Sequence, residues 1–87
     1  MRYLAEFYLP SHGADLKALV TAARRAAAQL SDSGRTVRFL TAIHAHQDET
    51  CFAVYEAASA DVVAAAGELA GFSFDRIVEA TTTSPDN

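Results

Sequence analysis

The amino-acid sequence predicts an α+β domain of the ferredoxin-like type, with a βαββαβ order of elements and two helices on one face of a four-stranded antiparallel sheet. Three observations predict it: strand-like and helix-like hydrophobic patterns alternate in that order, turn residues separate them, and 87 residues leave room for one domain. We expect the strand order 4-1-3-2, a single domain over residues 1–80 and a flexible polar tail over residues 81–87.

The first strand and helix are bounded by residues that favour their ends. Residues from Arg2 to Leu9 are rich in aromatic and apolar side chains, which is typical of a strand, and Pro10 ends the run. A helix is expected from about Ala14, because apolar residues then recur at helical spacing. Gly34 suits a left-handed residue after the end of that helix.

The second half of the chain contains the other three strands and the second helix. The predicted elements are strands at Val37–His46, Thr50–Ala57 and Phe74–Ala80 and a helix between Ser59 and Gly71. Ser59 is a good N-cap for that helix. Asp48 and Glu49 are expected to form a two-residue turn, so that Gln47 pairs with Thr50.

Composition excludes several classes of function. The net charge is −4 and the only basic pair, Arg24-Arg25, lies on a predicted helix, so no basic stripe for nucleic acid is expected. No apolar run approaches the ~20 residues that a membrane span needs. We do not expect residues Met1 to Glu6 to form a signal peptide, because Glu6 interrupts a short apolar run. The single cysteine, Cys51, excludes an internal disulfide, and a lone thiol without an export signal indicates a cytoplasmic protein.

Alternation along the strands predicts which side chains face the helices. We expect a helix-covered side made of Tyr3, Ala5, Phe7, Val37, Phe39, Ile43, Ala45, Phe52, Val54 and Val78. The opposite, open side is expected to carry Leu4, Glu6, Tyr8, Arg38, Leu40, Ala42, His44, His46, Cys51, Ala53, Tyr55, Ala57, Ile77 and Glu79. This mixture is too apolar to remain in water, and a domain of this size buries only roughly 60–65% of its unfolded surface. We therefore expect a homodimer whose sheets face each other and enclose a small cavity.

Three segments of the sequence resemble a known family. They are Arg2–Pro10, Asp48–Phe52 and Phe74–Ala80, which read RYLAEFYLP, DETCF and FDRIVEA. The chain resembles the small bacterial ferredoxin-like proteins of unknown function that include a nickel-binding protein. The resemblance spans nearly the whole chain. It implies a dimeric α+β barrel and nickel binding, and it assigns no ligand residues.

His44 and His46 are the first candidate site residues, as metal ligands. Two positions apart on one strand, they should project from the same face, roughly 7 Å apart at the backbone. Two such imidazoles can ligate nickel, copper or zinc if a third ligand converges, and Cys51 is expected opposite His46. The alternative is a solvated pair near the hairpin tip, with Cys51 as an inert buried thiol.

Glu6 is the second candidate, as a ligand-binding or acid–base group facing His44 across Ala53. The alternative is a salt bridge of Glu6 with Arg38, Arg2 or Arg76 that only fixes the interface. Tyr8, Tyr55 and Glu79 would line the same cavity and hold a small ligand, or they would simply pack at the interface.

Three functions therefore remain open from the sequence. The first is a small cytoplasmic metal-binding homodimer, with nickel suggested by the resemblance. The second is a dimeric α+β barrel enzyme or carrier that binds a small molecule of aromatic or polyketide-like type. Its site would be Glu6, Tyr8, Tyr55, Glu79 and His44, with Glu6 or His44 as the acid or base. The third is a purely structural or regulatory dimer.

Overall fold

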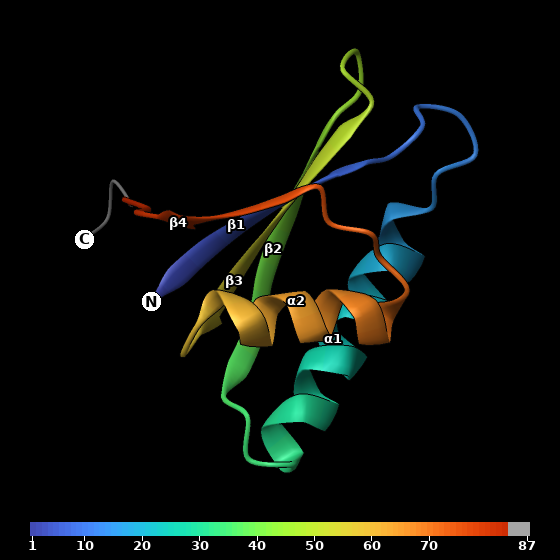
Figure 1. The fold of residues 1–87 in the computed structure, drawn as a ribbon. Helices are drawn as coiled ribbons and strands as arrows, with labels where there is room; N and C mark the ends of the chain where they lie inside the picture. The colour runs from blue at the N-terminus through green and yellow to red at the C-terminus, as the bar shows by residue number, and fades with distance from the viewer. Residues whose placement is uncertain (84–87) are drawn as a thin grey trace.

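The computed structural model describes residues 1–83 and has the predicted order of strands and helices (Figure 1). The elements are β1 (Arg2–Tyr8), α1 (Leu16–Asp32), β2 (Val37–Ala45), β3 (Thr50–Ala57), α2 (Ala60–Ala70) and β4 (Arg76–Ala80). Residues 81–83 continue the chain without regular structure. The rest of the predicted tail lies outside the described residues.

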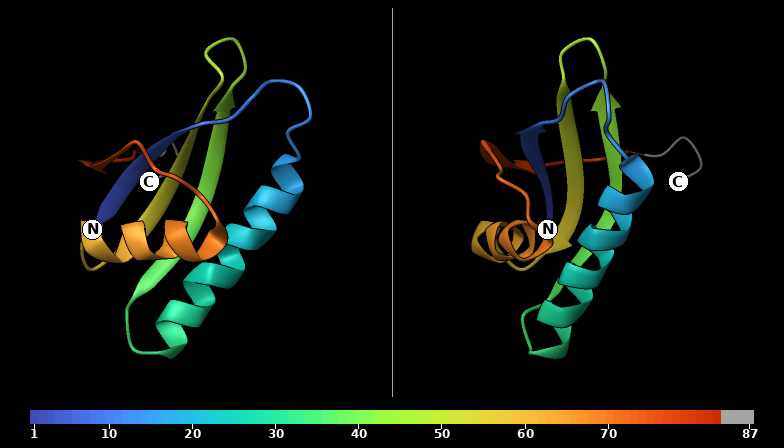
Figure 2. Two further views of the ribbon diagram at one scale, coloured as in Figure 1. Left: turned by 45° about the vertical axis from the view of Figure 1, so that its right-hand side comes forward. Right: turned by 90° about the vertical axis from the view of Figure 1, so that its right-hand side faces the viewer.

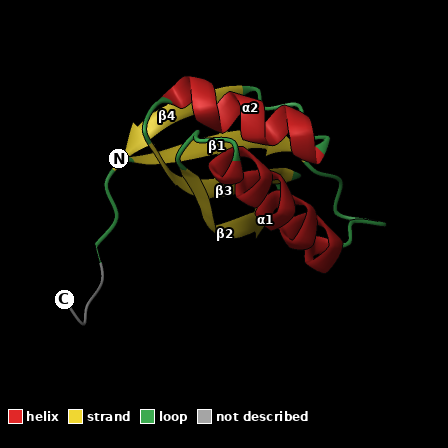
Figure 3. Ribbon diagram, turned by 90° about the horizontal axis from the view of Figure 1, so that it is seen from below, coloured by secondary structure: helices red, strands yellow, loops and turns green. Residues whose placement is uncertain are grey.

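The four strands form one antiparallel sheet in the order β2-β3-β1-β4, which is the predicted 4-1-3-2 order read from the other edge. Both helices cover the same face (Figure 3), with α1 over the β2–β3 side and α2 over the β1–β4 side. The ferredoxin-like α+β prediction is therefore confirmed. Within residues 1–83, no helix is both long enough and apolar enough to cross a membrane.

Both helices begin and end close to the residues that the sequence predicts. The Asp15 carboxylate accepts a hydrogen bond from the Ala18 N–H (3.1 Å) and caps α1, which begins two residues later than expected. After α1 the chain turns through Gly34 at φ +92°, and the Arg35 N–H bonds back to the Leu30 carbonyl (2.9 Å). Gly71 ends α2 in the same left-handed region, at φ +88°.

The core lies between the sheet and the helices. Alanines fill much of the contact, and an aromatic cluster closes the end beneath α2. Phe7 stacks on Phe72 with ring centroids 5.1 Å apart, and Phe74 lies 5.5 Å from Phe7 and 6.1 Å from Tyr55. Gly67 lets α2 approach this cluster, because a Cβ added there would lie 2.3 Å from the Phe74 ring.

The side chains of β1 face as predicted, but those of β3 do not. Tyr3, Ala5 and Phe7 are buried under the helices. Each is paired directly with a β3 residue, and directly paired residues share a face of the sheet. Cys51, Ala53, Tyr55 and Ala57 therefore also face the helices and are buried. Phe52 and Val54 lie on the open side, although Val54 is buried as well. In β4 the same pairing puts Ile77 on the helix side and Val78 on the open side.

The geometry of the β2–β3 hairpin explains why the predicted faces of the β2 side chains are partly wrong. Its turn spans residues 46–49 rather than two residues, so Ala45 pairs with Thr50. A β-bulge between Phe39 and Thr41 then reverses the alternation along β2. Val37 and Phe39 face the helices as expected, but beyond the bulge Ala42 and His44 do so and Ile43 turns outward.

Candidate functional site

The structure brings His44 and His46 together at the tip of the β2–β3 hairpin. Their ring centroids lie 4.4 Å apart. His44 is the second-last residue of β2 and is half-buried, whereas His46 is exposed and begins the turn. Imidazole nitrogens are the commonest protein ligands for nickel, copper and zinc, so the pair has the chemistry of a metal site.

A backbone contact fixes the orientation of the His44 ring. Its Nε2 lies 3.0 Å from the carbonyl oxygen of Leu9, the residue after β1. A carbonyl can only accept a hydrogen bond, so Nε2 carries the proton and the lone pair is on Nδ1. Metal-binding histidines are usually held by such a bond from the second ring nitrogen. In the neutral His44 ring, Nδ1 is therefore the nitrogen with a lone pair to offer.

The loop after β1 is bonded to the hairpin turn. Figures 1 and 2 show both segments at the same end of the sheet. The Leu9 N–H donates to the Glu49 carbonyl (2.8 Å), and the Ser11 N–H donates to the Glu49 carboxylate (2.9 Å). The Ser11 hydroxyl also donates to the His46 carbonyl. These bonds hold the backbone around both imidazoles.

Ser11 and Glu49 are site residues that sequence reasoning missed. They lie 38 positions apart, and no periodicity or motif relates them. Glu49 has φ +48°, an unusual value for a residue with a side chain, which its three contacts with the Leu9–Ser11 segment and the turn compensate. His12, the remaining histidine, is exposed in the same loop.

Cys51 lies on the strand next to His44, but unlike the two histidines it is fully buried. It pairs with His44, not with His46 as expected, and it is fully buried. Burial raises the pKa of its thiol, and a thiol ligates metal only as the thiolate. Among residues 1–83, no group of three His, Cys, Asp or Glu side chains is placed to hold a metal ion. Within residues 1–83 the candidate site therefore consists of the two imidazoles.

Glu6 lies on the other face of the sheet from His44. It pairs with Phe52 and Arg76, and these side chains border a hollow of about 90 Å³. Ala53, which was expected between Glu6 and His44, is buried under the helices. The prediction that Glu6 faces His44 is therefore wrong.

Tyr8, Tyr55 and Glu79, which were expected to line one cavity with Glu6, lie in three different places. Tyr55 is fully buried under the helices, where burial first and Cys51 second raise its pKa to about 12. Its hydroxyl has no hydrogen-bond partner among residues 1–83. Tyr8 is 64% exposed. Glu79 is exposed on the edge strand β4, beside a separate hollow that includes Arg2 and Thr81.

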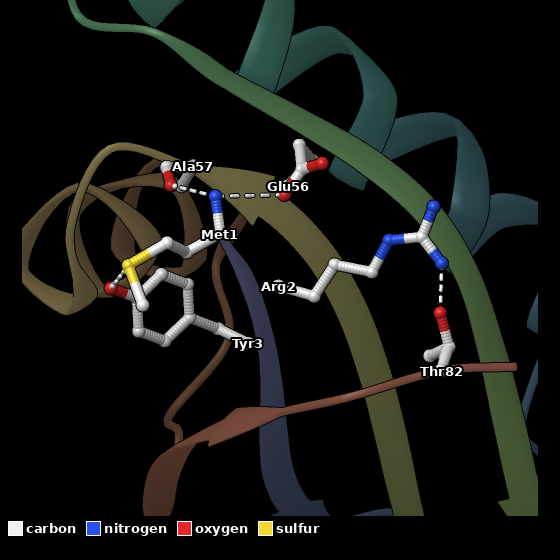
Figure 4. A network of polar contacts seen from close by, with 6 residues as sticks. All are labelled: Met1, Arg2, Tyr3, Glu56, Ala57 and Thr82. Atoms are coloured by element: carbon white, nitrogen blue, oxygen red, sulfur yellow. Dashed lines mark hydrogen bonds and ion pairs between the residues drawn. The ribbon is translucent and has the colours of Figure 1, made fainter.

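A polar network joins the start of β1 to β3 and to the chain after β4 (Figure 4). The Met1 ammonium donates to the Ala57 carbonyl (3.2 Å) and lies 3.0 Å from the Glu56 carboxylate. The contact between the ammonium and the Glu56 carboxylate is the main cause that lowers the pKa of Glu56. The Arg2 guanidinium donates to the Thr82 hydroxyl. This network ties strand ends together and includes neither histidine of the pair.

Fold and site together define a small ferredoxin-like α+β domain with a two-imidazole candidate metal centre. The sequence model of the family described as "Nickel responsive protein SCO4226-like" matches residues 3–80, and the chain therefore belongs to this family. The chain also resembles the crystal structure of SCO4226 from Streptomyces coelicolor A3(2), with a TM-score of 0.70 and 23% sequence identity over 97% of this chain and 100% of that one. At that identity the likeness shows the shared fold. No curated protein matches the chain.

Proposed function

We propose that this protein is a small metal-binding protein that takes up nickel through His44 and His46. The observation that carries the proposal is the oriented imidazole pair, with rings 4.4 Å apart and the His44 Nε2 held by the Leu9 carbonyl. The family description, nickel responsive, supports nickel among the metals that imidazole suits. Cys51 is a weaker candidate ligand. A thiol binds metal as the thiolate, and burial raises the pKa of Cys51 and so keeps the thiol protonated.

Two imidazoles leave coordination positions that water or further side chains would fill. This open arrangement suits reversible binding better than a closed structural site, which needs four strong protein ligands. We place this activity in the cytoplasm, which the free thiol of Cys51 supports.

Calorimetric titration of chelator-treated protein with nickel, cobalt, copper and zinc tests the proposal. We expect saturable nickel uptake that is lost in the double variant His44→Ala, His46→Ala. The matched control is His12→Ala, which removes the third histidine and should leave affinity unchanged within about twofold. The folded protein should also melt at a higher temperature with excess nickel, since a ligand at 100 times its Kd adds about 2.7 kcal/mol. Uptake that survives the double variant would refute the assignment.

We also propose that the chain forms a homodimer through the open face of the sheet. Leu4, Phe52, Val54 and Val78 share this face, and Ile43 on it is 57% exposed. Glu6 and Arg76 are paired neighbours there, and neither forms a salt bridge within residues 1–83. In a twofold contact the acid of one copy can meet the guanidinium of the other.

A charge exchange tests this interface. Glu6→Arg and Arg76→Glu should each weaken the dimer, because each places like charges opposite one another. The double variant should restore it, as measured by light scattering coupled to gel filtration. A lone protomer in the unaltered protein would contradict the proposal.

The alternative function, a barrel enzyme or carrier with a ligand cavity, has less support. A small-molecule pocket usually encloses ~300 Å³ or more. The hollow beside Glu6 measures about 90 Å³ in one chain and stays below that size even when doubled. Tyr55 faces the other way, and Tyr8 and Glu79 do not border this hollow. These facts favour a packed interface.

A further inference from the structure

A groove of about 650 Å³ lies between α1 and the edge strand β2, away from the histidine pair. Its α1 wall includes Ala27 and Ala28, whose side chains are too short to fill the space between helix and strand. Its floor includes Val37 and Phe39, both almost fully buried. The sequence therefore leaves an apolar hollow here, in the volume range of small-molecule sites.

The strand edge at this groove is already occupied by a side chain. The Ser31 hydroxyl donates to the Val37 carbonyl (2.7 Å) and accepts from the Val37 N–H (3.3 Å). An added peptide strand would need these same backbone groups. A peptide therefore cannot pair with β2 at Val37 as an added strand. A small molecule, which does not need these backbone groups, can still enter the groove.

Arg24 on α1 and Arg38 on the edge strand β2 both border the groove. Within residues 1–83 neither forms a salt bridge. Glu56 also borders the groove as the cross-strand neighbour of Arg38, and its carboxylate contacts the Met1 ammonium. Arginine presents a planar fork of donors that matches a carboxylate.

We propose that this groove binds an organic carboxylate with an apolar body. The carboxylate would bond to Arg24 and Arg38, and the apolar body would cover Val37, Phe39 and the alanines of α1. The proposal is independent of the metal site, because none of the groove residues belongs to the hairpin tip.

Octanoate is a suitable probe, used below its micelle-forming concentration, with 1-octanol as the neutral counterpart. Amide NMR titration of the full chain should show saturable shifts at residues 27–28 and 37–39. Octanol should bind roughly three- to tenfold more weakly, the range for a partly exposed charge-assisted contact. Arg24→Gln and Arg38→Gln should each weaken octanoate binding by a similar factor.

Arg25→Gln is the matched control, since this exposed neighbour on α1 does not border the groove. It removes the same charge and should leave octanoate binding unchanged. Ala28→Leu keeps a good helix former and should block binding by filling the groove. Absence of saturable shifts, equal binding of octanol and octanoate, or equal losses in Arg25→Gln and Arg24→Gln would each overturn the proposal.

Discussion

Replacing Tyr55 by phenylalanine should make the protein more stable. Tyr55 is fully buried, and its hydroxyl finds no hydrogen-bond partner among residues 1–83. A buried hydroxyl without a partner costs roughly 1–3 kcal/mol of folding free energy. The ring itself packs edge-on against Phe39 and Phe74, at centroid distances of 5.5 and 6.1 Å, and phenylalanine keeps both contacts.

Removing the hydroxyl leaves a small cavity, and the cost of this cavity offsets little of the expected gain in stability. A void of order 10 Å³ costs about 0.2–0.3 kcal/mol at roughly 24 cal/mol per Å³. The net expectation is a gain of about 1 kcal/mol or more in the free energy of unfolding. For a chain of this length, 1 kcal/mol corresponds to a rise of about 4–8 °C in melting temperature.

Urea unfolding of Tyr55→Phe, followed by circular dichroism, measures the effect. Tyr8→Phe is the control, because Tyr8 is 64% exposed and its change should stay within about 0.5 kcal/mol. A loss of stability in Tyr55→Phe would show that the hydroxyl has a favourable partner, such as a buried water, and would refute the reasoning.

Three further substitutions or conditions test the core and the helix ends. Raising the pH from about 10 to about 12 should lower stability, because the unfolded Tyr55 ionises near 10 while its folded pKa is about 12, and Tyr55→Phe should reduce this loss. Gly67→Ala should cost about 1–2 kcal/mol, since overpacking against Phe74 exceeds the gain in helix propensity; a more stable variant would contradict the contact. Asp15→Ala should cost about 1 kcal/mol in thermal unfolding, whereas Asp15→Asn should retain most of the cap.

The order of elements was predictable because each one has clear local signals. Thr50–Ala57 has the predicted bounds, and Gly34 and Gly71 take the left-handed backbone expected after the two helices. These features depend on a few neighbouring residues and on steric limits that any chain obeys. The sheet order then follows from the usual way in which such elements pack.

The faces of β3 were not predictable from alternation alone. Both of its sides are apolar, with Cys51, Ala53 and Tyr55 on one and Phe52 and Val54 on the other. The expected two-residue turn at Asp48 and Glu49 placed the second set on the same side as Val37 and Phe39, and so on the core side. The pairing of β3 with β1 decides the matter, and that pairing is a long-range property that local periodicity does not carry.

The bulge in β2 has a consequence for function because it sets the face on which His44 lies. Without the extra residue after Phe39, the alternation would turn His44 to the open side, among the residues of the proposed dimer interface. With the bulge, His44 lies on the helix side, where the chain after β1 supplies the Leu9 carbonyl. The proposed metal site and the proposed dimer interface therefore lie on opposite faces of one sheet. A charge variant at Glu6 that separates the protomers should leave nickel affinity intact, and a loss of both together would mean that the imidazoles need a second copy to complete their site.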